Sequence, residues 1–334
     1  MSTLWFHPID WQTPTLLDAA RWFASGDNWL RVLYVLWLDI HRHWPAHLLV
    51  TAVAVGLLVG YAVSVGRDAT KDSFVRRARR LLFHALTPAL VLGGLLCWYG
   101  WRLTAVDDAV DFTAFAATVG AGLCALGIAG GSLLLAEGLF APQGWAATVI
   151  GWPDRTTRPV RRGVRFALAD APLPVFVMGA ALALRNPEWK NLLGPVALAA
   201  TLACLAASLW LMLPRDRAAL KELLSLRDDS PMLQRATVLR ALVVGFPLAL
   251  LVAALIGFHE LAYLVMWRFV LTLWLMLGLT LTKSYLLVRS NTPSSPSLRQ
   301  LEKRLEAIKL VGLAAIWAGA AWRIAHDLWA LLRS

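Results

Sequence analysis

Apolar runs recur along most of the chain and are separated by short polar segments. From residue 46 onward, no long polar block interrupts them. A helix needs about 20 mostly apolar residues to cross the hydrocarbon core of a bilayer. The pattern therefore predicts an all-α polytopic membrane protein with about eight spans, at residues 46–66, 81–101, 112–137, 166–184, 193–213, 241–258, 261–282 and 308–330.

Residues 1–45 follow a different pattern, semi-polar and rich in Trp and His. Their longest apolar stretch, residues 30–38, is too short to cross a bilayer. We predict one or two amphipathic helices over residues 15–44 that lie on the membrane surface. The chain is thus divided into an interfacial segment, residues 1–45, and a single helical membrane domain, residues 46–334.

Three of the predicted spans have the same kind of beginning: an arginine-containing amphipathic lead, then mostly apolar residues, then a proline. In chain order these stretches read FVRRARRLLFHALTP, RPVRRGVRFALADAP and LQRATVLRALVVGFP. Proline lacks a backbone N–H and clashes with the preceding turn, so it kinks a helix. We therefore predict three repeated helical hairpins with kinks at Pro88, Pro172, Pro174 and Pro247. The alternative is that any span entered from the cytoplasm begins with arginines.

Composition agrees with a membrane protein. Hydrophobic residues make up 58% of the 334 positions, against about 45–50% in soluble domains. Many of the 17 tryptophans lie at the ends of apolar runs, where indole prefers the level of the lipid headgroups. The three cysteines lie within apolar runs and lack the spacing of a metal site.

Basic residues are concentrated in alternate loops, and the formal net charge is +11. The segments 67–80, 138–165, 214–240 and 283–309 hold 23 of the 32 Lys and Arg residues. Because cytoplasmic loops carry the excess of Lys and Arg, these segments are predicted to be cytoplasmic and both termini to lie outside. This distribution favours membrane topology over nucleic-acid binding as the reason for the positive charge.

Two arginine clusters lead directly into spans, at the depth where anionic lipid headgroups lie. A basic residue near such a surface contributes about 1 kcal/mol of attraction. We therefore predict that both clusters bind anionic headgroups, through Arg76, Arg77, Arg79, Arg80, Arg155, Arg158, Arg161, Arg162 and Arg165.

Ionisable residues inside predicted spans are functional candidates, because a charge in the bilayer is costly. Arg268 either pairs with a neighbouring helix or a lipid phosphate, or else extends to the interface or pairs with Glu260. For Asp170, a local pair with an arginine such as Arg165 is favoured over a role in proton relay. The last span contains Arg323 and Asp327, which are four residues apart and therefore share a helix face on which they can pair.

The sequence contains little that indicates catalysis. The HRHWPAH stretch of the first segment has a spacing that can ligate a metal, but no Cys or acidic partner follows it. No nucleophile, base and orienting group can be assembled, so we expect no enzyme activity, no cofactor and no metal site. Span 112–137 is rich in Gly and Ala. It is either a helix that packs closely against its neighbours or one that lines a pore.

Several segments resemble one family in the expected order. They are KDSFVRRARRLLFHALTPALVLGGLLCWYGW at 71–101, VGAGL at 119–123, the GLFAPQGW turn with Gly151, Trp152 and Pro153 before the arginine run, and residues 240–287. Together they resemble the inner-membrane domain that precedes the pore in the large, MscK-type branch of MscS-like mechanosensitive channels.

The resemblance implies helices that form tilted paddles around a central pore and couple bilayer tension to gating. From the resemblance we expect that the family's long periplasmic region, pore helix and cytoplasmic vestibule have no counterpart in this sequence. We therefore expect a tension- or lipid-responsive protein of the bacterial inner membrane that acts with a pore-forming partner or as a homo-oligomer. Two alternatives remain open: a stand-alone channel or transporter lined by span 112–137, and a structural scaffold of the membrane.

Overall fold

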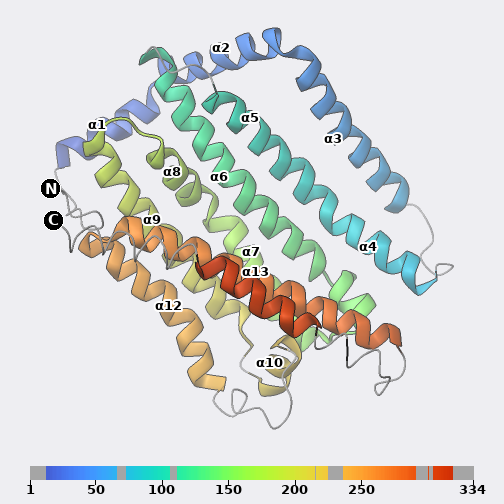
Figure 1. Ribbon diagram of the computed structural model, residues 1–334. Coiled ribbons are helices and arrows are strands. Elements are labelled where there is room, and N and C mark those ends of the chain that lie inside the picture. The colour runs from blue at the N-terminus through green and yellow to red at the C-terminus, as the bar shows by residue number, and fades with distance from the viewer. Residues whose placement is uncertain are drawn as a thin grey trace.

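The computed structural model describes residues 13–65, 73–105, 111–214, 216–224, 236–290, 300 and 304–318. These residues form helices joined by turns and short connections, with no strand in the described ranges. Figure 1 shows long helices packed side by side, with α1 and α2 across one end of the bundle. The helices before the arginine-rich turn are α1 (Thr13–Ala24), α2 (Gly26–Arg42), α3 (Trp44–Val65), α4 (Phe74–Pro88), η2 (Ala89–Gly93), α5 (Gly94–Thr104) and α6 (Asp111–Leu139). Those that follow are η3 (Ala146–Ile150), α7 (Asp154–Asp170), α8 (Pro172–Leu182), α9 (Pro187–Met212), α10 (Arg217–Leu224), α12 (Ala236–Ile256) and α13 (His259–Ser290).

Among the described residues, six segments are long and apolar enough to cross a membrane: Trp44–Val65, Phe74–Thr104, Ala114–Leu139, Pro187–Met212, Thr237–Ile256 and His259–Arg289. The pair α7 and α8 adds a seventh if it is one broken span. Seven of the eight predicted spans coincide with these segments, so the all-α polytopic fold is confirmed. The eighth, 308–330, lies partly outside the described residues, and both Arg323 and Asp327 lie outside them.

The span predicted at 166–184 is not a single helix. It is interrupted at Ala171, and α7 and α8 meet at an angle of 55°. Pro172 is the first residue of α8, and its ring prevents α7 from continuing with regular hydrogen bonds. Only the 11 residues of α8 follow this break.

The three prolines of the proposed repeat lie in different local structures. Pro88 ends α4 and is followed by the π-helical turn η2, which continues into α5. Pro172 and Pro174 begin a separate helix, whereas Pro247 lies inside an uninterrupted α12. The leads are similar in sequence, but the structure does not build three equal hairpins from them.

Helix α6 lies at the centre of the bundle and contacts α2, α4, α5, η2, α7 and α8. Its glycines let the neighbouring backbones approach closely. A Cβ atom added at Gly120 would lie 2.5 Å from the carbonyl oxygen of Gly100 on α5. On another side, one added at Gly122 would lie 2.7 Å from the ring of Phe176 on α8. Gly120 and Gly122 therefore serve close packing of α6 against α5 and α8.

Helix α3 lies at the edge of the bundle. Only 6% of its span is buried, against 44% of the α9 span, and Figure 1 shows it beside α4 and α5 with its other side open. Its C-terminal end contacts α4 through a hydrogen bond of 2.6 Å between Ser64 Oγ and His84 Nε2. Most of the α3 surface is therefore left uncovered by the described part of the chain.

Candidate functional site

The arginine-rich helix α7 has two distinct faces. Small and apolar side chains are buried at Thr156, Val160, Gly163, Val164 and Ala167, a spacing of three and four residues that gathers them on one side of the helix. On the opposite side lie the exposed arginines Arg155, Arg158, Arg162 and Arg165. Just before α7, Gly151 ends η3 in the left-handed conformation, with a φ of 80°.

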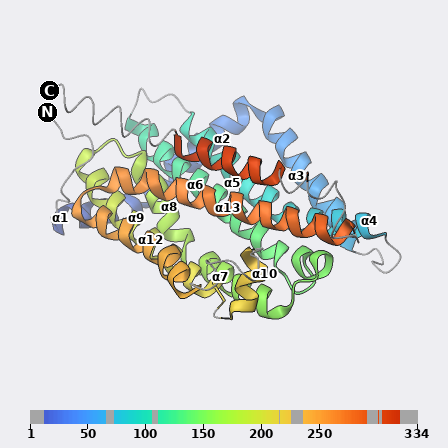
Figure 2. The same cartoon turned by 60° about the horizontal axis from the view of Figure 1, so that its bottom comes forward.

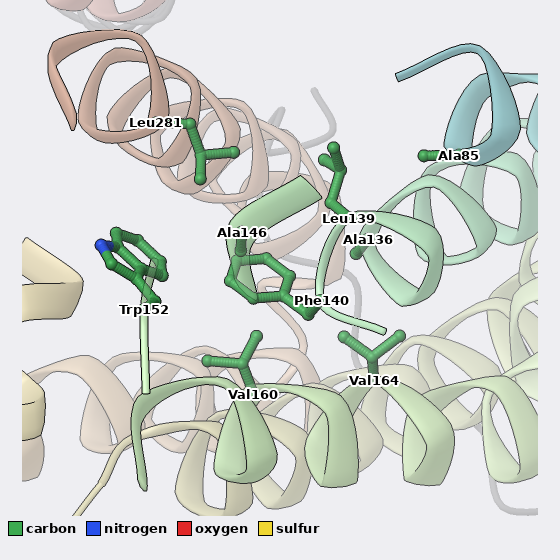
Figure 3. Packing of buried hydrophobic residues seen from close by; sticks show 9 residues of the cluster. All are labelled: Ala85, Ala136, Leu139, Phe140, Ala146, Trp152, Val160, Val164 and Leu281. Atoms are coloured by element: carbon green, nitrogen blue, oxygen red, sulfur yellow. The ribbon is translucent and has the colours of Figure 1, made fainter. Parts of the chain in front are cut away.

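The apolar face of α7 packs against the end of α6 and against α9. Figure 3 shows Val160 and Val164 of α7 facing Phe140, with Trp152 beside them. The rings of Phe140 and Trp152 are 6.0 Å apart. At Gly163 the approach to α9 is so close that an added Cβ would lie 2.5 Å from the carbonyl oxygen of Ser208. In the conformation that the structure describes, these contacts set the direction in which the arginine face points.

A groove of about 1160 Å³ lies along the arginine face, between α7, the end of α9 and the beginning of α12. All five arginines of α7 line it, together with Arg240 of α12 and the aromatic ring of Trp210 on α9. Asp154 is the single acidic side chain among the described residues that line it. The groove therefore concentrates positive charge at the ends of two membrane spans.

Two of these arginines are already paired. Arg165 Nε lies 2.7 Å from Glu137 Oε1 at the end of α6, and Arg161 Nε lies 3.7 Å from the same oxygen. Arg165, the arginine considered for Asp170, therefore pairs with Glu137. Asp170 is exposed at the end of α7, where its backbone carbonyl accepts a hydrogen bond of 3.7 Å from Cys204.

The remaining arginines of the groove have different surroundings. The guanidinium of Arg240 lies 4.1 Å from the ring centre of Trp210 and donates to the Trp210 carbonyl at 3.0 Å. Within the described part of the chain, neither Arg158 nor Arg162 makes an ion pair. Both are exposed on the groove side of α7.

The other predicted cluster lies on α4 and does not line the groove. There Arg76 and Arg79 are exposed, whereas Arg77 and Arg80 are half-buried. The sequence thus identified both basic helices, and among the described residues the arginines of α7, not those of α4, line this groove.

Comparison with known proteins places this architecture in a family. The family model for the mechanosensitive ion channel inner membrane domain 1 matches residues 46–291, about three quarters of the chain. The chain belongs to this family. No curated protein and no solved structure matches the chain. The matched region of this inner membrane domain begins within α3 and ends one residue after α13, so it contains the whole arginine groove.

A second polar site joins the inner membrane domain to the segment before it. Asp39 of α2 lies outside the matched region, and its side chain is only 8% exposed. Arg102 of α5 donates to both of its carboxylate oxygens, through Nε to Oδ2 at 2.9 Å and through Nη2 to Oδ1. His47 of α3 bonds to the same carboxylate, with 2.9 Å between Nε2 and Oδ2. One buried carboxylate therefore links three helices.

The hydrogen bonds around His47 indicate which of its ring nitrogens carries the proton. The indole N–H of Trp98 points at Nδ1 of His47 at 3.2 Å, so Nδ1 accepts and Nε2 carries the proton that is donated to Asp39. Burial raises the pKa of Asp39, but its hydrogen bonds to Arg102 and His47 outweigh this effect and hold that pKa below its ordinary value. The HRHWPAH stretch thus contributes a hydrogen-bonded histidine, and no group placed to hold a metal occurs in the described ranges.

Arg268 lies on α13 within the inner membrane domain. It donates to the backbone carbonyl of Ile316 in the helical segment 304–318, and Figures 1 and 2 both show this segment, in red, along α13. Close by, Trp317 Nε1 donates to Thr272 Oγ1 at 3.1 Å. Of the interpretations considered for Arg268, the structure agrees with an interaction with a neighbouring helix rather than a pair with Glu260.

Proposed function

We propose that the chain is a tension-responsive membrane domain and that the junction of α7 and α8 is its moving part. The observation that carries the proposal is the 55° break at Ala171 between a basic amphipathic helix and an apolar one. Helix α8 is embedded among spans, whereas the arginines of α7 suit the headgroup region. A bilayer that thins or is stretched changes the preferred tilt of such a pair, at a cost of fractions of a kcal/mol per Å.

In the proposed mechanism, lipid headgroups at the inner face of a bacterial inner membrane would bind the arginines of α7. The beginnings of α4 and α12, helix α10 and the end of α13 all lie toward the lower and right-hand side in Figure 1. The arginine- and lysine-rich segments therefore gather on one side of the bundle, which supports a cytoplasmic position for that side and an outer position for α1 and α2. Anionic headgroups bound to the α7 arginines would transmit bilayer forces to the hinge.

The pore is proposed to come from a partner or from other copies of the chain. The small-residue helix α6, considered as a pore lining, has close neighbours on two sides, with Gly120 against α5 and Gly122 against α8. These two glycines are therefore occupied by neighbouring helices and do not line a water-filled pathway. The packing of α6 favours a sensing or force-transmitting role.

Spin-label distances across the hinge test the proposal. We expect the distance between labels at Pro153→Cys, before α7, and Leu182→Cys, at the end of α8, to change when the bilayer is made thinner. Helix α7 has 17 residues and is about 25 Å long, so a rotation of roughly 10° moves its far end by about 4 Å. Pulsed electron spin resonance in vesicles of short- and long-chain lipids measures this change, with Cys97, Cys124 and Cys204 replaced by Ala.

A label pair on unbroken spans serves as the control. Ile128→Cys on α6 and Val196→Cys on α9 are both at exposed positions, and their separation is expected to stay constant. If the hinge pair is equally constant across bilayers of different thickness, the tension-responsive hinge is wrong.

Patch recordings test the separate statement about the pore. Liposomes that contain only the purified chain are expected to show no tension-gated current. Currents from the chain alone would instead favour a stand-alone channel, and the assignment of the pore to a partner would have to be abandoned.

A further inference from the structure

The geometry points to a specific phosphate-binding site in the arginine groove, in which one phosphate is held by α7 together with α12. This deepens the proposed function, and it rests on that function only for the position of α7 at the inner membrane surface. A general attraction between basic helices and an anionic surface would involve both arginine clusters. The specific site involves only the cluster that lines the arginine groove.

Charge is the first reason to expect a phosphate here. Glu137 lies close to Arg161 and Arg165, whereas Arg158 and Arg162 have no ion pair within the described ranges. These two residues are four positions apart, so they project from neighbouring turns of the same face of α7. A planar guanidinium donates two parallel hydrogen bonds to a phosphate, which makes arginine well suited to such a ligand.

The opposite wall of the groove is the second reason. Arg240 reaches the groove from α12, and its stacking on Trp210 of α9 holds its guanidinium in place. A phosphate between α7 and Arg240 would therefore connect two helices that are separated by a long stretch of sequence. Because α7 adjoins the hinge at Ala171, an occupied site would restrain the proposed motion.

The residues that line the groove, and their place at the ends of membrane spans, indicate which kind of molecule carries the phosphate. Its walls include Leu211, Leu213 and Pro214 at the end of the α9 span, and Arg240 lies near the beginning of the α12 span. Apolar side chains beside a cluster of arginines suit the phosphate of an anionic lipid, whose chains continue into the bilayer. A soluble phosphate compound offers the same anionic group without the chains.

Two double variants that remove the same amount of charge distinguish a specific phosphate site from a general attraction to anionic surfaces. Arg158→Gln with Arg162→Gln removes two groove arginines, whereas Arg76→Gln with Arg79→Gln removes two exposed arginines of α4 that do not line the groove. The full chain in neutral detergent micelles is titrated calorimetrically with short-chain phosphatidylglycerol, and short-chain phosphatidylcholine is the uncharged comparison. Hydrogen bonds to charged groups predict that the groove pair weakens binding about tenfold or more beyond the α4 pair.

A third variant guards against a loss of binding caused by misfolding. Asp154→Asn removes the acidic side chain from the lining and is expected to strengthen phosphatidylglycerol binding severalfold, which a damaged fold does not do. Equal weakening by the two arginine pairs, or no gain from Asp154→Asn, would overturn the site.

Inorganic pyrophosphate distinguishes the two sources of the phosphate. Binding of phosphatidylglycerol alone, weakened by the groove pair, supports a lipid site. Binding of both probes with the same sensitivity supports a phosphate site that is open to the cytoplasm. These titrations involve no change of bilayer thickness. The phosphate site can therefore be refuted while the spin-label distances still change with thickness, and the hinge can be refuted while the groove still binds phosphate.

Discussion

Replacing Gly120 by alanine is expected to destabilise the bundle by about 1–3 kcal/mol, the usual cost of overpacking a close contact. The added Cβ would lie 2.5 Å from the Gly100 carbonyl oxygen and 2.8 Å from the Leu103 side chain. Backbone cannot move aside as a flexible side chain can, so α5 and α6 must separate. The midpoint of thermal unfolding in detergent, followed by circular dichroism, measures the loss.

Gly130 provides a matched control on the same helix. A Cβ added there meets nothing within 4 Å, so Gly130→Ala gains the better helix propensity of alanine, up to about 1 kcal/mol. The two variants are expected to shift the midpoint in opposite directions. If both raise it, the contact between α5 and α6 is looser than the structure places it.

This contact also illustrates what the sequence allows one to predict. The Gly- and Ala-rich composition of span 112–137 indicates a helix that others approach closely, but it does not indicate which glycine meets which neighbour. Helix α6 has small residues on all sides and no clear polar face, so periodicity does not fix its orientation. Only tertiary structure places Gly120 against Gly100 and leaves open space where a side chain at position 130 would lie.

The candidate site was predictable to a similar extent. The α7 arginines stand out because they are close in sequence and precede an apolar run. The residues that surround them cannot be recognised from the sequence, because Glu137, Trp210 and Arg240 lie on other helices. The break at Ala171 follows from local chemistry at Pro172, whereas Pro247 causes no break in α12. Proline alone was therefore an insufficient basis for three equal hairpins.

The network around Asp39 was missed because its members are distant in sequence. Asp39 and Arg102 are 63 residues apart. The histidines near Asp39 were considered only as candidate metal ligands. A local signal was nevertheless present. Asp39 shares one face of α2 with Val32 and Val35, and all three side chains are buried. An acid on an apolar face of an interfacial helix requires a cationic partner from elsewhere in the fold.

Replacing Asp39 by asparagine is accordingly expected to cost about 3–5 kcal/mol, the loss typical of a broken buried ion pair. The variant leaves Arg102, whose side chain is 16% exposed, without a negative partner. It also weakens the link between α2 and the α3 residue His47. Thermal unfolding in detergent at neutral pH measures the difference. Asp18→Asn on α1 is the control, because Asp18 and its partner Arg21 are 59% and 79% exposed and such pairs contribute less than about 1 kcal/mol.

The pH dependence of the stability difference between the native chain and Asp39→Asn shows whether Asp39 stabilises the fold by its charge or by its packing. The pKa of Asp39 is lowered in the folded state, so its contribution is fully present above the unfolded value of about 3.9 and is lost as the pH falls through the folded pKa. The stability difference between the native chain and Asp39→Asn should therefore be constant near neutrality and shrink below about pH 4. Asparagine does not titrate there. A difference that stays constant through this acidic range would mean that the carboxylate acts by packing alone, and that the charge of Arg102 does not anchor α2 to the inner membrane domain.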